Sequence, residues 1–358
     1  MANALQIFRE KLFSEITEIP PLLQSSYLPS LDGLRGISII MVVAYHTLTI
    51  NGHTDFNGIF GVNVFFVISG FIITTLLLKE KVKTREVSLT KFYTRRFLKI
   101  IPVAYLYLLV ILLLNGYYKV IALPDILSAA LFIKNTHIIP SHWDEAAGHF
   151  WSLSVEEQFY IIFPFILKRS VNSYLVIVIA LIIVIPILLT IGNNIGYHGL
   201  VIFLDFFRYI TPILTGALCS VLVFKKIITK RFYPNNIVTN LLVLFLAYEI
   251  YCGPGFLHEM IYKNFISSVL VAMLIVNNLS YSNDLFFKLL NSKILVGIGM
   301  ASYSVYVWQQ VFLMWHPWQH IVNDTWSVLF NLLALSSISF CSYYFIERNL
   351  ARLKSRFR

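Results

Sequence analysis

The amino-acid sequence predicts an all-α, polytopic integral membrane protein with about ten transmembrane helices and one short re-entrant or interfacial helix. Of the 358 residues, 58% are hydrophobic and only 13% are charged, whereas soluble globular chains carry about 25% charged residues. Apolar stretches that could each form about 20 residues of helix recur along the chain. Lys and Arg residues lie in short clusters between these stretches, as expected of loops between membrane spans.

Ten apolar stretches are predicted to cross the membrane, because each approaches the length that a hydrocarbon core of about 30 Å requires. They are residues 36–54, 60–78, 100–118, 150–167, 173–191, 201–224, 237–252, 264–278, 294–315 and 325–346. A further apolar segment, 121–134, begins with Leu123-Pro124-Asp125 and is shorter. We therefore expect it to form a re-entrant or interfacial helix and not an eleventh crossing.

The distribution of positive charge supports the ten-span arrangement. With the N-terminus in the cytoplasm, the inside segments hold 24 of the 28 Lys and Arg residues, which is the bias that the positive-inside rule describes. A crossing at 121–134 would reverse every later loop and remove this bias. We expect residues 1–27 to form a cytoplasmic segment without a signal peptide, 28–347 a transmembrane domain and 348–358 a basic cytoplasmic tail.

The composition also argues against several other kinds of site. The net charge of +10 is divided among short clusters, so it does not form the continuous basic patch typical of nucleic-acid binding. Cys219, Cys252 and Cys341 are far apart in or near apolar runs, which predicts neither a disulfide framework nor a CxxC metal site. The segment 137–151 contains three His residues but lacks the tight ligand spacing of a metal site.

Arg35 and His46 are ionisable residues that bracket an apolar run. They are eleven residues apart, so on a helix they lie about 16 Å apart along the axis and within about 20° of each other around it. An ionisable side chain inside a span is costly and indicates function, and histidine suits general-base work on a hydroxyl. The alternative is a core histidine hydrogen-bonded to a neighbouring helix, with Arg35 as a positive-inside anchor.

Several motifs taken together resemble the acyltransferase 3 family of membrane-bound acyltransferases. They are 31-LDGLRG-36, the Arg-x10-His spacing, 61-GVNVFFVISGFI-72, 95-RRFLKIIP-102, 150-FWSLSVEEQFY-160 and 302-SYSVYVW-308. Members of this family O-acylate extracytoplasmic glycans and some other acceptors, and they take the acyl group from cytoplasmic acyl-CoA. The resemblance, which runs from about Leu28 to Glu347, implies an O-acyltransferase of the bacterial inner (cytoplasmic) membrane. It further implies acyl-CoA as co-substrate, acetyl as the expected acyl group, and no tightly bound cofactor or metal.

Matching positions imply roles on the donor side. His46 corresponds to the catalytic base and Arg35 to its partner in positioning the acyl donor. Arg95 and Arg96 are expected to receive the CoA phosphates, since the guanidinium fork suits phosphate; for each, a topology-setting basic cluster is the alternative. Glu156 is expected to face His46 and assist it.

Three further residues are expected on the acceptor side. Tyr160 lies four residues after Glu156 and shares its face of a helix. Trp151 suits stacking on a sugar ring, although a membrane-interface aromatic explains it almost as well. Arg208 is predicted to form a neutralising pair with Asp205, with acceptor binding as the alternative.

Local details and departures from the family pattern add further expectations. Ser154-x-x-Glu157 predicts a capping box at the start of a helix. Asn63 stands where an aspartate is common in the family, and Gln309 stands where many relatives carry histidine. The competing function, from another class, is a non-catalytic carrier or flippase of a glycan or lipid, whose intramembrane charges would line a substrate pathway. The sequence leaves the acceptor and the acyl chain length open.

Overall fold

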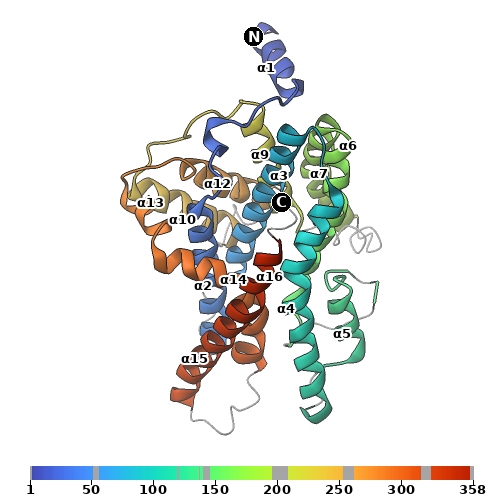
Figure 1. The fold of residues 1–358 in the computed structure, drawn as a ribbon, viewed down its shortest axis with the longest axis vertical. Helices are drawn as coiled ribbons and strands as arrows, with labels where there is room; N and C mark the ends of the chain where they lie inside the picture. The colour runs from blue at the N-terminus through green and yellow to red at the C-terminus, as the bar shows by residue number, and fades with distance from the viewer. Residues whose placement is uncertain are drawn as a thin grey trace. The chain divides into compact units, whose positions relative to one another are not determined.

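A computed structural model describes residues 2–50, 56–118, 121–136, 138–139, 146–195, 209–252, 262–315 and 324–354. Within these ranges every regular element is helical (Figure 1), which confirms the predicted all-α class. The chain divides into two compact units. Unit 1 comprises Met1–Arg35, Asn63–Val87 and Phe159–Gly297, and unit 2 comprises Gly36–Val62, Ser88–Gln158 and Ile298–Arg358.

Unit 1 is organised around helix α9. Its elements are α1 (Ala2–Phe13), η1 (Pro21–Leu23), the start of α2 (Pro29–Ile50), most of α3 (Ile59–Thr84), the end of α6 (Phe150–Arg169), α7 (Val171–Asn194), α9 (Thr211–Phe224), α10 (Ile237–Cys252), α12 (Lys263–Asn277), α13 (Leu285–Leu290) and the start of α14 (Lys293–Gln310). Helix α9 packs against α7 and α12, and α12 packs against α10. Because nearly all of its residues are buried, α9 forms the centre of this unit.

Glycines allow α3 and α9 to approach until their backbones touch. A Cβ added to Gly70 would lie 1.9 Å from the carbonyl oxygen of Ile213, and a Cβ added to Gly216 would lie 2.0 Å from that of Val67. Such contacts through small residues are typical of helix pairs in membranes, where no hydrophobic force drives association. Any side chain at either glycine would push the two helices apart.

Polar side chains add directional links from α3 to its neighbours in unit 1. The hydroxyls of Thr75 and Ser220 hydrogen-bond to each other at 2.8 Å. The amide of Asn63 donates to Ser267 at 3.3 Å and accepts from Ser268 at 3.1 Å. These bonds give the buried Asn63 a structural role between α3 and α12.

Unit 2 contains the rest of α2, α6 and α14 together with helices that belong to it alone. These are α4 (Leu89–Tyr118), α5 (Leu123–Ala130), the π-helical turn η2 (Val311–Trp315), α15 (Asp324–Ser342), the π-helical turn η3 (Tyr343–Glu347) and α16 (Arg348–Lys354). Helix α4 packs against α5, η3 and α16, while α15 packs against η2. At 8 residues, α5 is too short to cross a membrane, as predicted for this segment.

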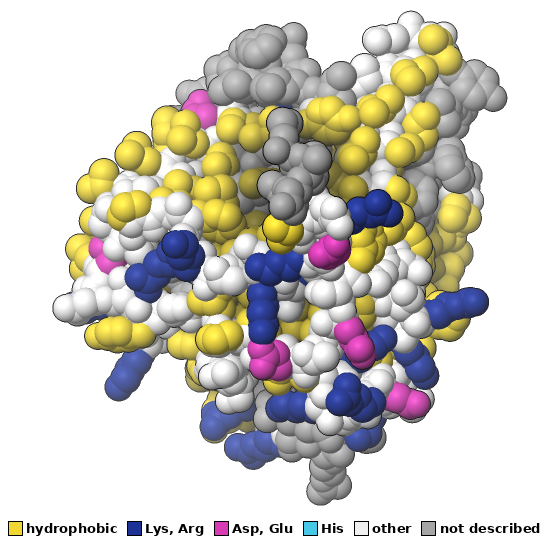
Figure 2. All heavy atoms as spheres, turned by 90° about the horizontal axis from the view of Figure 1, so that it is seen from above, with side chains coloured by type: hydrophobic (Ala, Val, Ile, Leu, Met, Phe, Trp, Pro, Cys, Tyr) yellow, Lys and Arg dark blue, Asp and Glu magenta, His cyan; other side chains and the backbone are white. Residues whose placement is uncertain are grey.

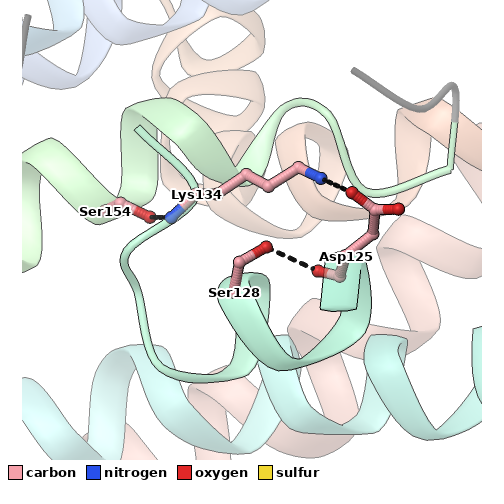
Figure 3. Close-up of polar contacts among 4 residues, drawn as sticks. All are labelled: Asp125, Ser128, Lys134 and Ser154. Atoms are coloured by element: carbon pink, nitrogen blue, oxygen red, sulfur yellow. Dashed lines mark hydrogen bonds and ion pairs between the residues drawn. The ribbon is translucent and has the colours of Figure 1, made fainter. Parts of the chain in front are cut away.

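A buried ion pair links α5 to the chain that follows it (Figure 3). The Lys134 Nζ lies 2.5 Å from the Asp125 Oδ1, and the two side chains are only 2% and 3% exposed. The Lys134 amide donates to the Ser154 hydroxyl at 3.1 Å, and the Ser128 hydroxyl donates to the Asp125 carbonyl at 2.9 Å. These contacts fix α5 against the first half of α6.

The start of α6 corrects one sequence prediction. The helix begins at Phe150, so Ser154 lies in its second turn and is not an N-cap. Its hydroxyl donates to the carbonyl oxygen of Phe150 at 2.8 Å and accepts from the Lys134 amide. The predicted capping box between Ser154 and Glu157 is therefore wrong. The helix begins four residues before Ser154, and the Ser154 hydroxyl accepts a hydrogen bond from the backbone of a residue that is distant in sequence.

The predicted number of spans is not confirmed. Five helices in the described ranges are long and apolar enough to span a membrane, namely those over Pro29–Thr49, Ile59–Thr84, Leu89–Tyr117, Val171–Gly192 and Trp326–Leu353. Helices α9, α10 and α12 are apolar but shorter. Helix α6 has 20 residues but carries two Glu, a Lys and an Arg, which lower its hydropathy. Part of the predicted span 201–224 lies outside the described residues.

Three basic loops are expected to lie on the same side of the membrane. Within unit 1, Lys81 after the apolar part of α3 donates to the carbonyl oxygens of Leu167 and Lys168, and Lys225 after α9 donates to Asn172. Single cysteines placed at Lys83, Arg169 and Lys226 of a chain without its native cysteines should show the same access to an impermeant thiol reagent. A cysteine within 142–147 should show the opposite access; labelling of Arg169→Cys and Lys83→Cys from opposite sides would contradict this topology.

Breaking the buried ion pair should destabilise unit 2. Lys134→Met removes the cation that lies 2.5 Å from the buried Asp125 carboxylate, so the free energy of unfolding should fall by about 3–5 kcal/mol. The double variant Lys134→Met/Asp125→Leu removes both charges and should recover most of that loss. Thermal unfolding of the full chain in detergent measures both variants. The single variant Asp125→Leu completes the comparison. A double variant whose loss of stability equals the sum of the losses in Lys134→Met and Asp125→Leu would show that the pair does not act as a unit.

Candidate active site

His46 lies in the part of α2 that belongs to unit 2. Its ring Nδ1 is 3.1 Å from the Met314 Sδ in η2, and its ring centroid is 5.1 Å from that of Tyr45. A thioether sulfur is a weak acceptor that cannot donate, so this contact favours the neutral tautomer with its proton on Nδ1. The lone pair then lies on Nε2, the atom that a general base would use.

His149, one of the three His residues of the segment 137–151, is buried close to His46. It is 4% exposed and lies near enough to His46 for the two ring charges to interact. Its ring makes edge contacts with Tyr107 at 5.3 Å and with Tyr306 at 5.7 Å between centroids. The signal in the sequence is its adjacency to the Phe150–Tyr160 motif, but only tertiary packing reveals its burial.

Hydroxyl groups hold the segment around His149 in place. The Ser152 and Tyr306 hydroxyls lie 2.5 Å apart, and each lies within hydrogen-bond distance of the His149 carbonyl oxygen. Because each hydroxyl has one proton, one of them donates to the carbonyl oxygen while the other donates to its neighbouring hydroxyl. The Tyr107 hydroxyl donates to the carbonyl oxygen of Ala146. These bonds connect α4, α6 and α14 of unit 2, so the histidine sits in a rigid frame.

Charged groups of unit 2 cluster on α4 and α6. Glu157 lies within electrostatic range of Glu156 and Arg96, and Tyr306 lies within range of Glu156. The Arg96 guanidinium also lies 5.8 Å from the centre of the Phe92 ring. Arg96 therefore has a carboxylate and an aromatic ring as neighbours, which gives it a structural role beside its predicted one. Its neighbour Arg95 lies half-buried in the first turns of α4.

Gln309 and Trp308 of α14 present buried polar atoms to the interior of unit 2. Gln309 is fully buried, and neither its amide oxygen nor its amide nitrogen finds a hydrogen-bond partner among the described residues; the same holds for the Trp308 indole N–H. A buried polar group without a partner costs about 1–3 kcal/mol. Such groups therefore favour a polar occupant, a water or a substrate, in this interior.

The remaining predicted site residues have different surroundings. Arg35 belongs to unit 1, where its guanidinium lies 3.6 Å from the Asp32 carboxylate one turn earlier in α2. Tyr160 is buried in the part of α6 that belongs to unit 1, whereas Trp151 lies half-buried in the unit 2 part. Arg208 lies outside the described residues. In the described ranges no group of three or more His, Cys, Asp or Glu side chains could hold a metal ion.

This architecture defines a helical membrane protein with ionisable side chains, among them the buried His149, in the interior of unit 2. A family model described as an acyltransferase domain, that of the acyltransferase 3 family, matches residues 28–347. Because this match covers most of the sequence, the chain belongs to the acyltransferase 3 family.

Individual relatives are more distant. The chain is 26% identical over 344 residues to the O-acetyltransferase OatA of Staphylococcus aureus, with 90% of this chain and 57% of the relative covered. It is 27% identical over 350 residues to the peptidoglycan O-acetyltransferase OatA of Listeria monocytogenes, with 90% and 55% covered. A putative O-acetyltransferase of S. aureus is 30% identical over 315 residues, with 79% and 50% covered. The chain thus spans about half the length of these relatives, and no solved structure matches it.

Proposed function

We propose that the protein is a membrane O-acyltransferase that moves an acyl group, expected to be acetyl, from cytoplasmic acyl-CoA to a hydroxyl of an extracytoplasmic glycan. The observation that carries the proposal is the family match over 28–347, which contains Arg35 and His46 on one helix. Three similar proteins named as O-acetyltransferases support the same chemistry. The protein would act in the bacterial cytoplasmic membrane with both termini in the cytoplasm.

In this proposal His46 is the general base. Its Nε2 removes the proton of the acceptor hydroxyl while the hydroxyl oxygen attacks the thioester carbonyl. The carbon–sulfur bond breaks, and the leaving CoA thiolate takes the proton from the imidazolium. The contact between Nδ1 and Met314 supports this role, because it keeps the Nε2 lone pair available. Glu156 would stabilise the imidazolium, and His149 would position the reacting groups.

The donor would bind through arginines. Arg95 and Arg96 lie in the second turn of α4, and two forked guanidinium groups suit the phosphates of CoA. Arg35 lies eleven residues before His46 on α2, a separation of about 16 Å by helix rise. A pantetheine arm running along α2 from Arg35 would bring the thioester toward His46.

The acceptor would be a carbohydrate hydroxyl. The Listeria monocytogenes relative is named for peptidoglycan, which makes a cell-wall glycan the first acceptor to test. Trp151, Tyr160 and Arg208 are the residues proposed to contact it, since aromatic faces and a guanidinium both suit sugar rings and their substituents. Incubation of membranes with labelled acetyl-CoA, followed by mass spectrometry of the glycans, tests this function directly.

A carrier that moves a glycan or lipid without chemistry is the competing function. The Gln309 amide, which has no hydrogen-bond partner in the described part of the chain, suits a substrate pathway as well as a reaction site. The labelled-acetyl experiment separates the two functions. Transfer of label to a glycan requires the acyltransferase, whereas glycan translocation without label indicates the carrier.

Removing the proposed base should abolish transfer without unfolding the protein. His46→Ala should lose about 10²–10⁴-fold in rate while its thermal midpoint and acyl-CoA binding stay close to those of the unmodified chain. The double variant with Arg35→Ala should be hardly slower than His46→Ala alone, because groups that serve one reaction are not additive. Thr49→Val, which removes a hydroxyl from the next turn of α2, is the matched control and should stay active. A folded His46→Ala protein that transfers at the normal rate would refute this assignment.

Removing the arginines of α4 should weaken donor use. Arg95→Ala combined with Arg96→Ala should raise the KM for acyl-CoA more than it lowers kcat, because donor binding is lost before contacts specific to the transition state. Since Arg96 also interacts with Glu157, the single variant Arg95→Ala gives the cleaner test. Lys91→Ala, one turn earlier on α4, is the control. Steady-state kinetics with normal KM in all three variants would leave this cluster as a topology signal only.

A further inference from the structure

A second polar site lies in unit 1, and its lining contains none of the residues assigned to the proposed reaction. A cavity of about 250 Å³ opens where the chain after α1 meets α3, α7 and the end of α9. Cavities that hold drug-sized ligands measure about 300–1,000 Å³, so this one suits a small group and not a whole nucleotide. Its lining includes three cationic side chains, Lys81, Arg85 and Lys225, and one carboxylate, Glu15.

Lys225 is the buried cation of this cavity. The residue is only 4% exposed, and its amine donates to the Ser14 carbonyl oxygen and to the Asn172 Oδ1. Among the described residues no carboxylate pairs with it, and burial lowers the pKa of its amine. A buried positive charge that has only neutral partners is costly, so an anion in the cavity would stabilise it.

The other cations are held at the rim by the ends of helices. Lys81 donates to the last carbonyls of α6, at Leu167 and Lys168. Arg85 follows α3 directly and has a φ of 66°, the left-handed conformation of a residue that ends a helix. Figure 2, which views the molecule from the α1 end, shows Lys and Arg side chains spread over this face, with Asp and Glu among them.

The start of α7 adds backbone donors to the same cavity. Ser170, Val171 and Asn172 all line it. The Ser170 hydroxyl accepts from the amide of Ser173, which leaves the amides of Val171 and Asn172 without partners inside the helix. The N-terminus of a 24-residue helix also carries a partial positive charge that favours anions.

We propose that this cavity binds a phosphate group, with Lys225 as its buried cation and Arg85 as its outer cation. The group comes either from the headgroup of an anionic phospholipid or from a free phosphate compound, because the cavity lies where apolar helices end. The site does not depend on acyl transfer, since it contains none of the residues assigned to the reaction.

Two variants that change the charge of the cavity in opposite directions test this site. Arg85→Asn removes the positive charge and keeps a residue that tolerates the left-handed conformation, so the fold should be retained. It should weaken binding of phosphate compounds about fivefold at low ionic strength. Glu15→Gln removes the opposing carboxylate and should strengthen binding by about the same factor. Lys83→Gln, an exposed basic residue of α3 that does not line the cavity, should change nothing.

The probes are inorganic phosphate and short-chain phosphatidylglycerol, each titrated into the full chain in maltoside detergent with binding followed by the shift in thermal midpoint. Stabilisation by either probe that Arg85→Asn weakens and Glu15→Gln strengthens supports the site, and the probe that binds identifies the source of the phosphate. Equal binding by all variants, or binding of neither probe, would overturn the proposal. Normal acyl transfer by Arg85→Asn separates this outcome from failure of the proposed function.

Discussion

The backbone contact between α3 and α9 at Gly70 and Gly216 is the constraint on which unit 1 depends. Membrane helices gain little from burying apolar side chains against each other, so close contact has to come from small residues and from polar links. The glycines bring the backbones together, and the Thr75–Ser220 hydrogen bond adds direction. With α9 held there, α7 and α12 pack around it, and Lys225 at its end reaches Ser14 and Asn172. The polar cavity thus depends on the close backbone contact between α3 and α9.

Unit 2 uses polar side chains in two ways. Some are bonded to the backbone or to one another: the Tyr303 hydroxyl donates to the carbonyl oxygen of Ile100 at 2.6 Å, and the Ser304 hydroxyl donates to the Glu347 carboxylate. These groups are satisfied and serve the packing of α14 against α4 and η3. Among the residues that the structure describes, Gln309 has no such partner, and the contact of His46 with the Met314 sulfur is a weak one. Because each unpaired polar group in an interior is costly, these less satisfied groups support the proposal that a polar substrate binds there.

The sequence predicted the helical class, the helix that carries Arg35 and His46, and the short helix at α5, because apolar length and composition are local properties. It did not predict His149 as part of the site, because its burial depends on Tyr107 and Tyr306, which are distant in the chain. The capping box was wrong for a related reason, because the Ser154 hydroxyl accepts a hydrogen bond from the Lys134 amide, twenty residues earlier in the chain. The span count was not confirmed because α6 carries charged residues and several predicted spans form shorter helices. Local sequence patterns thus predicted the helices, whereas contacts between distant residues determine which side chains meet in the candidate active site.

The contact between His46 and Met314 has a consequence for the chemical durability of the protein. A thioether oxidises to a sulfoxide, which replaces a weak sulfur acceptor by a strong oxygen acceptor and adds bulk. Because the sulfur lies 3.1 Å from the imidazole Nδ1, an oxygen added to it would crowd the ring and change its orientation. Oxidation of this one side chain, which methionine sulfoxide reductase reverses, would therefore displace the proposed base without altering any residue of α2.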